Sequence, residues 1–188
     1  MYYENGVKQY EGGFDNGMFY GFGKLYDEKG NKIFEGNFKE GLQNGHGILY
    51  NKNQTKIYEG DFSKGHEEGW GNQYYTELEF SNCLRYSGEL KYFPCHESSL
   101  ADGKGEFYHT NGKILYKGGF YEGFPHKYGI LYHQNGVKCY EGQWKYSKKE
   151  GEGVEYNQNG DVFYRGTWVD NKPMSKNLAN SNNENYHL

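Results

Sequence analysis

Three groups of residues in this sequence have side chains that could do chemistry. His46 lies between two glycines in GHGILY (residues 45–50), which would suit a catalytic histidine on a tight turn or a phosphate-binding loop. Cys95 and His96 are the only neighbouring cysteine and histidine, and both residue types bind zinc. Four glutamates recur in one motif and could act as paired acids and bases: Glu11, Glu35, Glu59 and Glu141.

The elements that must position these residues follow an internal repeat with a period of 24 residues. One motif is an aromatic residue followed two positions later by glycine. It occurs as YEGGF at 10, FEGNF at 34, YEGDF at 58, YSGEL at 86, YKGGF at 116, YEGQW at 140 and YRGTW at 164. A second motif keeps the same phase: GFGKLY at 21, GHGILY at 45, GWGNQY at 69, GKGEFY at 103, KYGILY at 127 and GEGVEY at 151.

The spacing of the first motif also locates two insertions. Successive intervals are 24, 24, 28, 30, 24 and 24 residues, so four and six residues are added around one strand. The insertions fall near residues 81–85 and 94–102, and we expect them to be loops, which cost little to lengthen. The array is predicted to span residues 1–172. The polar, asparagine-rich segment 173–188 is predicted to be a tail, either disordered or lying over a partner.

A turn signal recurs between the two motifs. Asn-Gly flanked by apolar residues is typical of a two-residue type I′ hairpin, in which both central residues have positive φ. The signal occurs at residues 5–6, 29–30, 111–112, 135–136 and 159–160, with lysine in place of asparagine at 29. The second repeat has Asn53-Gln54 instead, so we expect a looser turn there. Each repeat is therefore predicted to be a β-hairpin.

Strand alternation assigns residues to faces. Tyr10, Gly12 and Phe14 point to one face, so we expect aromatic rings to lie over the gaps left by glycines. One hairpin cannot bury such a face alone, whereas stacked hairpins form a continuous aromatic layer. The predicted fold class is all-β: an elongated, twisted antiparallel sheet of stacked hairpins, with about six repeats of 24 residues plus edge half-repeats, curved into a ribbon with a groove.

The three motifs in phase resemble the MORN repeat, over nearly the whole of residues 1–172. Departures from its pattern are Lys127 in place of the first glycine of GxG, and Ser87 and Lys117 in place of the glutamate of YEG. The resemblance implies a rigid β-ribbon that docks partner segments in its groove. It also implies a role in cytoskeletal, ciliary axonemal or other large assemblies.

The repeat explains the three chemical groups without catalysis. The position of His46 is taken elsewhere by unlike residues, as expected of an outward-facing position: Phe22, Trp70, Lys104, Tyr128 and Glu152. The four glutamates recur once per repeat, as surface acids paired with lysines do. Cys95 and His96 lack a second ligand pair, and no nucleophile elbow, HExxH or Rossmann fingerprint occurs. We therefore expect a protein that is not an enzyme and has no cofactor or metal site.

Composition limits the partners. A net charge of −4 and a pI near 6.0 give no electrostatic footprint for nucleic acid and disfavour an anionic membrane. The three cysteines, Cys83, Cys95 and Cys139, are expected to be free thiols in a reducing compartment. The first residues lack the features of a signal peptide, and no apolar stretch is long enough to cross a bilayer. We expect a cytoplasmic protein.

The candidate partner-binding residues vary between repeats yet stay large and apolar, in or beside the loop that enters GxG. They are Met18, Phe19, Phe22, Trp70, Phe124 and Tyr128. The loop at 93–102 is a second candidate contact. The alternative is that these side chains fold back and cap the sheet.

Three functions remain open. The first is a non-catalytic scaffold that binds partner protein segments along the groove, as a subunit of a cytoskeletal or ciliary assembly. The second is a membrane-surface adaptor that binds phosphoinositides. The third is an enzyme whose site is formed by the insertions, with Cys95 and His96. Exposed edge strands also make a homodimer through the sheet edges a possibility.

Overall fold

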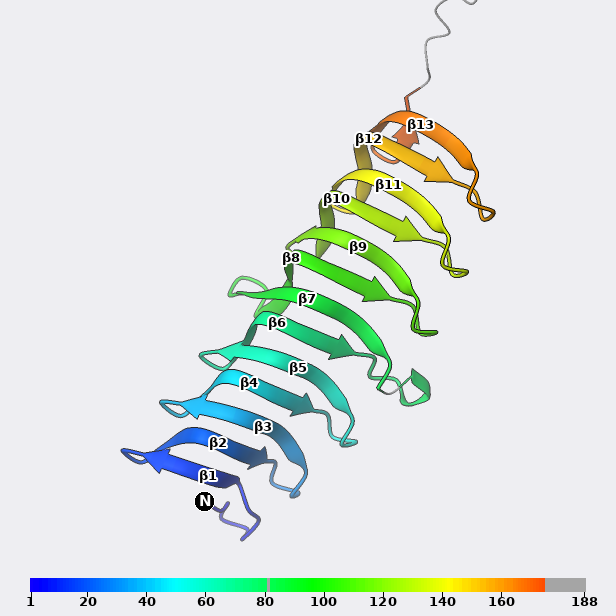
Figure 1. Ribbon diagram of the computed structural model, residues 1–188. Helices are drawn as coiled ribbons and strands as arrows, with labels where there is room; N and C mark the ends of the chain where they lie inside the picture. Colours follow the sequence, from blue (N-terminus) through cyan, green and yellow to red (C-terminus); the bar gives the residue numbers. More distant parts are fainter. Residues whose placement is uncertain (81, 175–188) are drawn as a thin grey trace, which may run out of the picture.

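The protein is one long antiparallel sheet. The computed structural model describes residues 1–80 and 82–174 of the 188, so most of the predicted tail lies outside the described part. Fourteen strands are hydrogen-bonded in chain order from β1 to β14, which confirms the predicted fold class (Figure 1). The strands are β1 Tyr10–Asp15, β2 Met18–Tyr26, β3 Lys32–Lys39, β4 Leu42–Tyr50, β5 Lys56–Ser63, β6 His66–Tyr74, β7 Leu84–Phe93, β8 Ser98–Tyr108, β9 Ile114–Tyr121, β10 Phe124–Tyr132, β11 Lys138–Lys145, β12 Lys148–Tyr156, β13 Val162–Val169 and β14 Lys172–Pro173.

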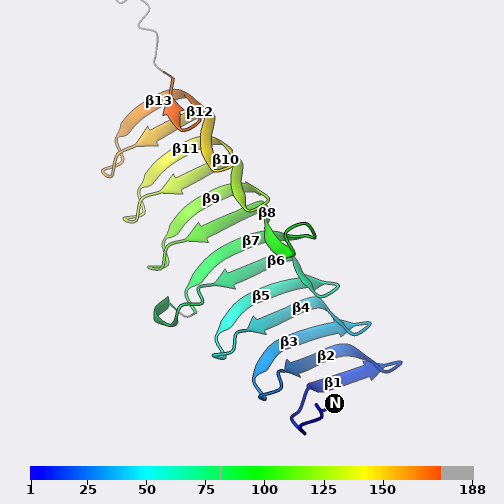
Figure 2. The same ribbon diagram turned by 180° about the vertical axis from the view of Figure 1, so that it is seen from behind.

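Each strand pairs only with its neighbours in the sequence. The ribbon twists progressively from the N-terminal to the C-terminal end, and the strands are bent along their length (Figures 1 and 2). A stack of this kind has contacts only between adjacent repeats, so its stability is expected to be a sum of nearest-neighbour terms. No helix in the described ranges is long and apolar enough to span a bilayer.

The core is built where a ring covers two glycines. Gly60 of β5 pairs with Gly71 of β6, and the ring of Tyr58 lies over both. A Cβ added at Gly71 would lie 2.3 Å from that ring, so alanine has no room there. The Tyr58 hydroxyl donates a hydrogen bond to the backbone carbonyl of Asp61, at 2.9 Å. The prediction that aromatic rings fill the gaps left by glycines is therefore confirmed.

The same arrangement recurs along the sheet. The equivalent hydroxyls bond the carbonyl three residues on in five other repeats: Tyr10 to Gly13, Tyr86 to Glu89, Tyr116 to Gly119, Tyr140 to Gln143 and Tyr164 to Thr167. Phe34 takes the tyrosine position in the second repeat and has no hydroxyl to donate.

A second aromatic row links consecutive repeats. The ring of Phe62 makes edge-to-face contacts with Phe34 at 5.0 Å and with Tyr58 at 5.2 Å. Trp144 contacts Tyr116 and Tyr140 in the same way, at 5.6 and 5.0 Å. Such contacts add stability beyond the buried area. They let a single sheet bury its rings almost completely, because each ring is covered by the ring of the next repeat.

The turns at the predicted Asn-Gly sites differ from the prediction. At residues 27–31 the Gly30 amide donates to the Asp27 carbonyl and the Asp27 amide donates to the Asn31 carbonyl, both at 2.9 Å. Only Gly30 has positive φ, at 84°, so this is a three-residue turn with one left-handed position. The predicted type I′ geometry is wrong here because the asparagine or aspartate side chain holds the loop instead, as when Asn135 Oδ1 accepts the Val137 amide at 2.9 Å.

The type I′ turns lie at the opposite edge of the sheet. Asn16 and Gly17 join β1 to β2, and both have positive φ, at 50° and 79°. The same geometry recurs at residues 40–41, 64–65, 122–123, 146–147 and 170–171. The looser turn expected at Asn53-Gln54 is also wrong: Gln54 takes the left-handed position at φ 61° and its amide bonds the Asn51 carbonyl at 2.9 Å.

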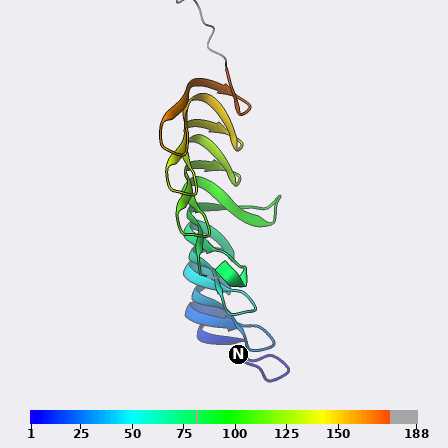
Figure 3. The ribbon, with the colours of Figure 1, turned by 90° about the vertical axis from the view of Figure 1, so that its right-hand side faces the viewer.

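The two insertions differ in structure. The first was expected to be a loop near residues 81–85, but residues 84–85 belong to β7; a short 3₁₀ helix, Leu78–Phe80, lies in the connection between β6 and β7. The second was expected to be a loop, but residues 98–102 belong to β8 and only 94–97 form the turn. The insertion therefore lengthens the β7–β8 hairpin, which protrudes beyond its neighbours (Figure 3).

Candidate interaction site

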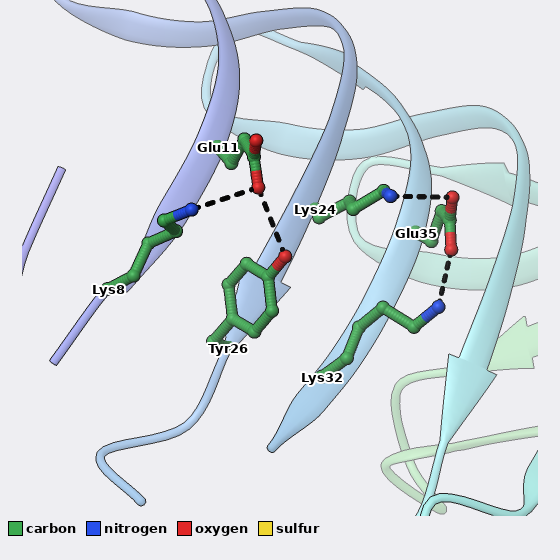
Figure 4. Close-up of polar contacts among 6 residues, drawn as sticks. All are labelled: Lys8, Glu11, Lys24, Tyr26, Lys32 and Glu35. Atoms are coloured by element: carbon green, nitrogen blue, oxygen red, sulfur yellow. Dashed lines mark hydrogen bonds and ion pairs between the residues drawn. The ribbon is translucent and has the colours of Figure 1, made fainter. Parts of the chain in front are cut away.

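The recurring glutamates form a ladder with lysine and tyrosine neighbours on the face opposite the core, here called the ladder face. Glu11 bonds Lys8 Nζ and the Tyr26 hydroxyl, each at 3.2 Å (Figure 4). Glu35 lies 2.5 Å from Lys32 Nζ and 3.5 Å from Lys24 Nζ. Hydrogen bonds from these lysines lower the pKa of each carboxyl, and the pKa of Lys32 is raised in turn.

This ladder is suited to holding the sheet together rather than to acid–base chemistry. A general acid needs a carboxyl whose pKa is raised toward neutrality, and these pKa values move the other way. Glu59 and Glu141 repeat the arrangement with Lys56 and Lys138.

The other two chemical groups are not assembled into a site either. His46 is exposed, and its Nδ1 lies 3.9 Å from Asp61 Oδ1. Cys95 is exposed near the tip of the β7–β8 hairpin, where His96 faces Phe93 with ring centroids 6.2 Å apart. Within residues 1–80 and 82–174, no three histidine, cysteine or acidic side chains are placed to hold a metal ion.

Five of the six predicted partner-binding residues are exposed, and the sixth is not. Trp70 is 55% exposed and Tyr128 56%, and Met18, Phe22 and Phe124 are exposed as well. Phe19 differs, because its ring stacks on Tyr10 with centroids 3.9 Å apart and packs against the core. We therefore assign Phe19 to the core and not to a partner-facing surface.

The exposed residues do not form one strip. Phe22 lies on β2, Trp70 on β6 and Tyr128 on β10, so three strands lie between each and the next. Met18 and Phe124 lie at the edge of the sheet, directly after type I′ turns.

An open depression of about 830 Å³ lies between Trp70 and Tyr128. Two small residues are part of its lining. Ser87 stands in the glutamate position of YEG, and Gly119 stands where the second and third repeats have Asn37 and Asp61 and the first has Gly13. The structure thus places two predicted residues at one hollow, although they are 58 residues apart in the sequence.

Some charged side chains that line the depression are paired with each other, and others are not. Lys117 pairs with Glu106 at 2.7 Å, and Glu89 Oε1 accepts the backbone amide of Lys104 at 3.3 Å. Burial acts to raise the pKa of Glu106, but hydrogen bonds from Lys117 and Tyr108 outweigh it and hold the pKa below its usual value. Lys104 and Lys127 also line the hollow, and neither forms an ion pair with a described residue.

A second hollow continues from the first toward the type I′ turns. It has a volume of about 490 Å³ and shares Lys127 and Tyr128 with the depression. Beside it an exposed aromatic cluster joins two turns, with Tyr146 centroids 6.0 Å from Tyr121 and 6.3 Å from Phe124. Together they make a continuous surface from β6 to the edge of the sheet near β12.

Sequence reasoning missed the depression, although the signal was present. Ser87, Lys117 and Lys127 were recognised as departures from the repeat pattern and were taken only as local irregularities. All three line the hollow. In a repeat array, neighbouring strands in the sequence are neighbours in the sheet. Residues that break the pattern on nearby strands, such as Ser87 on β7, Lys117 on β9 and Lys127 on β10, therefore mark one region of the surface.

Fold and surface define an array of stacked hairpins with an exposed aromatic and charged face. The MORN repeat model matches residues 10–32, 34–56, 140–162 and 164–176, and the chain belongs to the MORN repeat family. MORN repeats are commonly modules for protein or membrane interaction and are typically not enzymes.

The comparison with curated proteins finds no match. The stretch between the matched segments, 57–139, includes both insertions and all of the residues that line the depression.

Proposed function

We propose that this protein is a non-catalytic scaffold whose ladder face docks a segment of a partner protein in the depression between Trp70 and Tyr128. The observation that carries the proposal is the coincidence of two features at one place. Both exposed aromatics border one hollow, and three residues that break the repeat pattern also line it: Ser87, Lys117 and Lys127.

The chemistry of the hollow suits a peptide segment. Tryptophan and tyrosine are enriched among the residues that contribute most binding energy at interfaces. A volume of about 830 Å³ lies within the range of sites that hold several side chains.

The wider setting of the scaffold is part of the proposal. The family resemblance supports a cytoplasmic subunit of a cytoskeletal or ciliary assembly. Proximity labelling from the chain in its native cell is expected to enrich proteins of such an assembly. Enrichment of membrane proteins alone would contradict this setting and favour the adaptor that binds lipids.

Selection of random peptides on the whole chain tests the docking site. Peptides that bind the wild-type protein are expected to lose binding to Trp70→Ala and Tyr128→Ala. Phe22→Ala is the matched control, because Phe22 has the same repeat position and similar exposure (59%) but lies away from the depression. Peptides that bind all three variants equally well, or a library that yields no binders, would contradict the proposal.

A sheet-edge homodimer is compatible with this function. β14 pairs only with the end of β13, at Trp168 and Val169, so on the side away from β12 most of β13 has no neighbouring strand within the described residues. Val162 and Phe163 at this edge are exposed. Light scattering on the purified chain distinguishes a monomer from a dimer.

A further inference from the structure

We infer that the segment docked in the depression carries an acidic side chain beside an apolar one, and that Lys104 and Lys127 bind its carboxylate. This inference rests on the proposed function and specifies the chemistry of the partner. The two bordering aromatics receive the apolar side chain.

The first support is the pairing of lysines around the hollow. Six lysines of the ladder face form ion pairs with glutamates: Lys8, Lys24, Lys32, Lys56, Lys117 and Lys138. Lys104 and Lys127 have no such partner among the described residues, and both line the same hollow. Two cations without a counter-ion beside an apolar cleft favour an anionic ligand group.

The carboxylates of the hollow are already engaged. Glu106 bonds Lys117 and the Tyr108 hydroxyl, at 2.7 and 2.5 Å. Glu89 accepts the backbone amide of Lys104 rather than its ammonium group. The carboxylates of the hollow therefore leave the ammonium groups of Lys104 and Lys127 available to an incoming anion.

The second support is backbone strain at Lys127. This residue replaces the first glycine of GxG, and its φ is 64°, in the left-handed region. The equivalent glycines all have positive φ: Gly21, Gly45, Gly69, Gly103 and Gly151. A lysine is disfavoured in this conformation, and glycine serves the fold at five equivalent positions. The fold requires the left-handed backbone at this position but does not require lysine. A lysine kept there in spite of the strain points to a role for its side chain.

The test uses the selected peptides together with three lysine variants of the full chain. Lys104→Gln and Lys127→Gly are each expected to weaken binding about tenfold, and the peptides are expected to be enriched in aspartate or glutamate. Lys39→Gln is the control, because Lys39 is exposed, lies outside the hollow and forms no ion pair with a described residue. Binding is expected to weaken as salt concentration rises.

Lys127→Gly also separates function from structure. Restoring glycine is expected to raise Tm by roughly 2 °C, because the strain is removed, while binding falls. A residue with only a structural role would not give opposite effects on stability and binding.

The outcomes distinguish this inference from the proposed function. Peptides that require Trp70 but carry no acidic excess, or that bind the lysine variants normally, would overturn the inference and leave the docking site standing. Peptides that do not require Trp70 would overturn both. Vesicles containing phosphatidylinositol bisphosphate form a separate arm: stronger binding to vesicles than to any peptide, lost in the lysine variants, would assign the lysines to lipid.

Discussion

At the scale of single residues, the fold depends on a ring, a hydroxyl and a pair of glycines. The aromatic ring lies over the cross-strand glycines, and where the residue is tyrosine, as at Tyr58, its hydroxyl satisfies a carbonyl of its own strand. The sequence pattern predicted the ring and the glycines because both recur in phase. It could not predict the hydroxyl bond, because phenylalanine at position 34 keeps the pattern without making it.

The hydroxyl bond can be tested with reciprocal changes in neighbouring repeats. Tyr58→Phe removes the bond to the Asp61 carbonyl and is expected to cost about 1 kcal/mol in the free energy of unfolding. Phe34→Tyr adds a hydroxyl in reach of the equivalent carbonyl and is expected to stabilise by a similar or smaller amount. Both are measured by denaturant unfolding. If Phe34→Tyr destabilised as much as Tyr58→Phe, the hydroxyl would have no such role.

Buried tyrosines also set the alkaline limit of the fold. Burial raises the pKa of Tyr140 to about 12, and it raises those of Tyr58, Tyr86 and Tyr116 as well. The unfolded chain therefore loses these protons first, near pH 10. Their contribution to stability is complete below about pH 10 and is lost as pH rises toward 12.

The expected result is a free energy of unfolding that falls between pH about 10 and 12. Tyr140→Phe should make this fall less steep, because it removes one group whose pKa differs between the two states. Denaturant titrations at several pH values measure both slopes. An identical pH dependence in wild type and variant would contradict the explanation.

At the scale of elements, the sequence predicted the hairpins correctly but placed the type I′ turns at the wrong ends of the strands. Asn-Gly at residues 5–6 and 135–136 was taken as type I′, whereas the type I′ turns lie at sites such as Asn16-Gly17. Turns at both ends of the strands contain a glycine with positive φ, so the residue types alone do not distinguish the two kinds of turn. Loop length does: pairing of Asp15 with Met18 leaves two residues in the turn.

The type I′ turn between β11 and β12 shows what glycine contributes. Ser147 has φ 65° in the position that glycine takes at residue 123, where φ is 85°. Ser147→Gly is expected to stabilise the protein by up to about 1 kcal/mol, because it removes a left-handed serine. Gly123→Ser is the reciprocal change and is expected to destabilise by about 1 kcal/mol. Thermal unfolding compares the two, and effects of the same sign would show that backbone conformation does not decide these turns.

At the scale of the whole molecule, the array and its interaction site have different origins. The array follows from what the repeats share, so its all-β class, strand order and aromatic core could be predicted from the sequence. The depression follows from what individual repeats change. Ser87, Lys117 and Lys127 break the repeat pattern in its lining, and Trp70 and Tyr128 border it. Its position depends on strand pairing across four strands, which the spacing of motifs alone does not fix.

The central claim is that this hollow, and not the repeat face in general, docks a partner segment. Calorimetric titration with one selected peptide measures the dissociation constant for the wild-type chain, Trp70→Ala and Phe22→Ala. An aromatic residue central to an interface contributes about 2 kcal/mol, so Trp70→Ala is expected to weaken binding at least tenfold, while Phe22→Ala leaves it within about twofold. Equal losses in the two variants would show that any exposed aromatic of the array serves, and would contradict the claim.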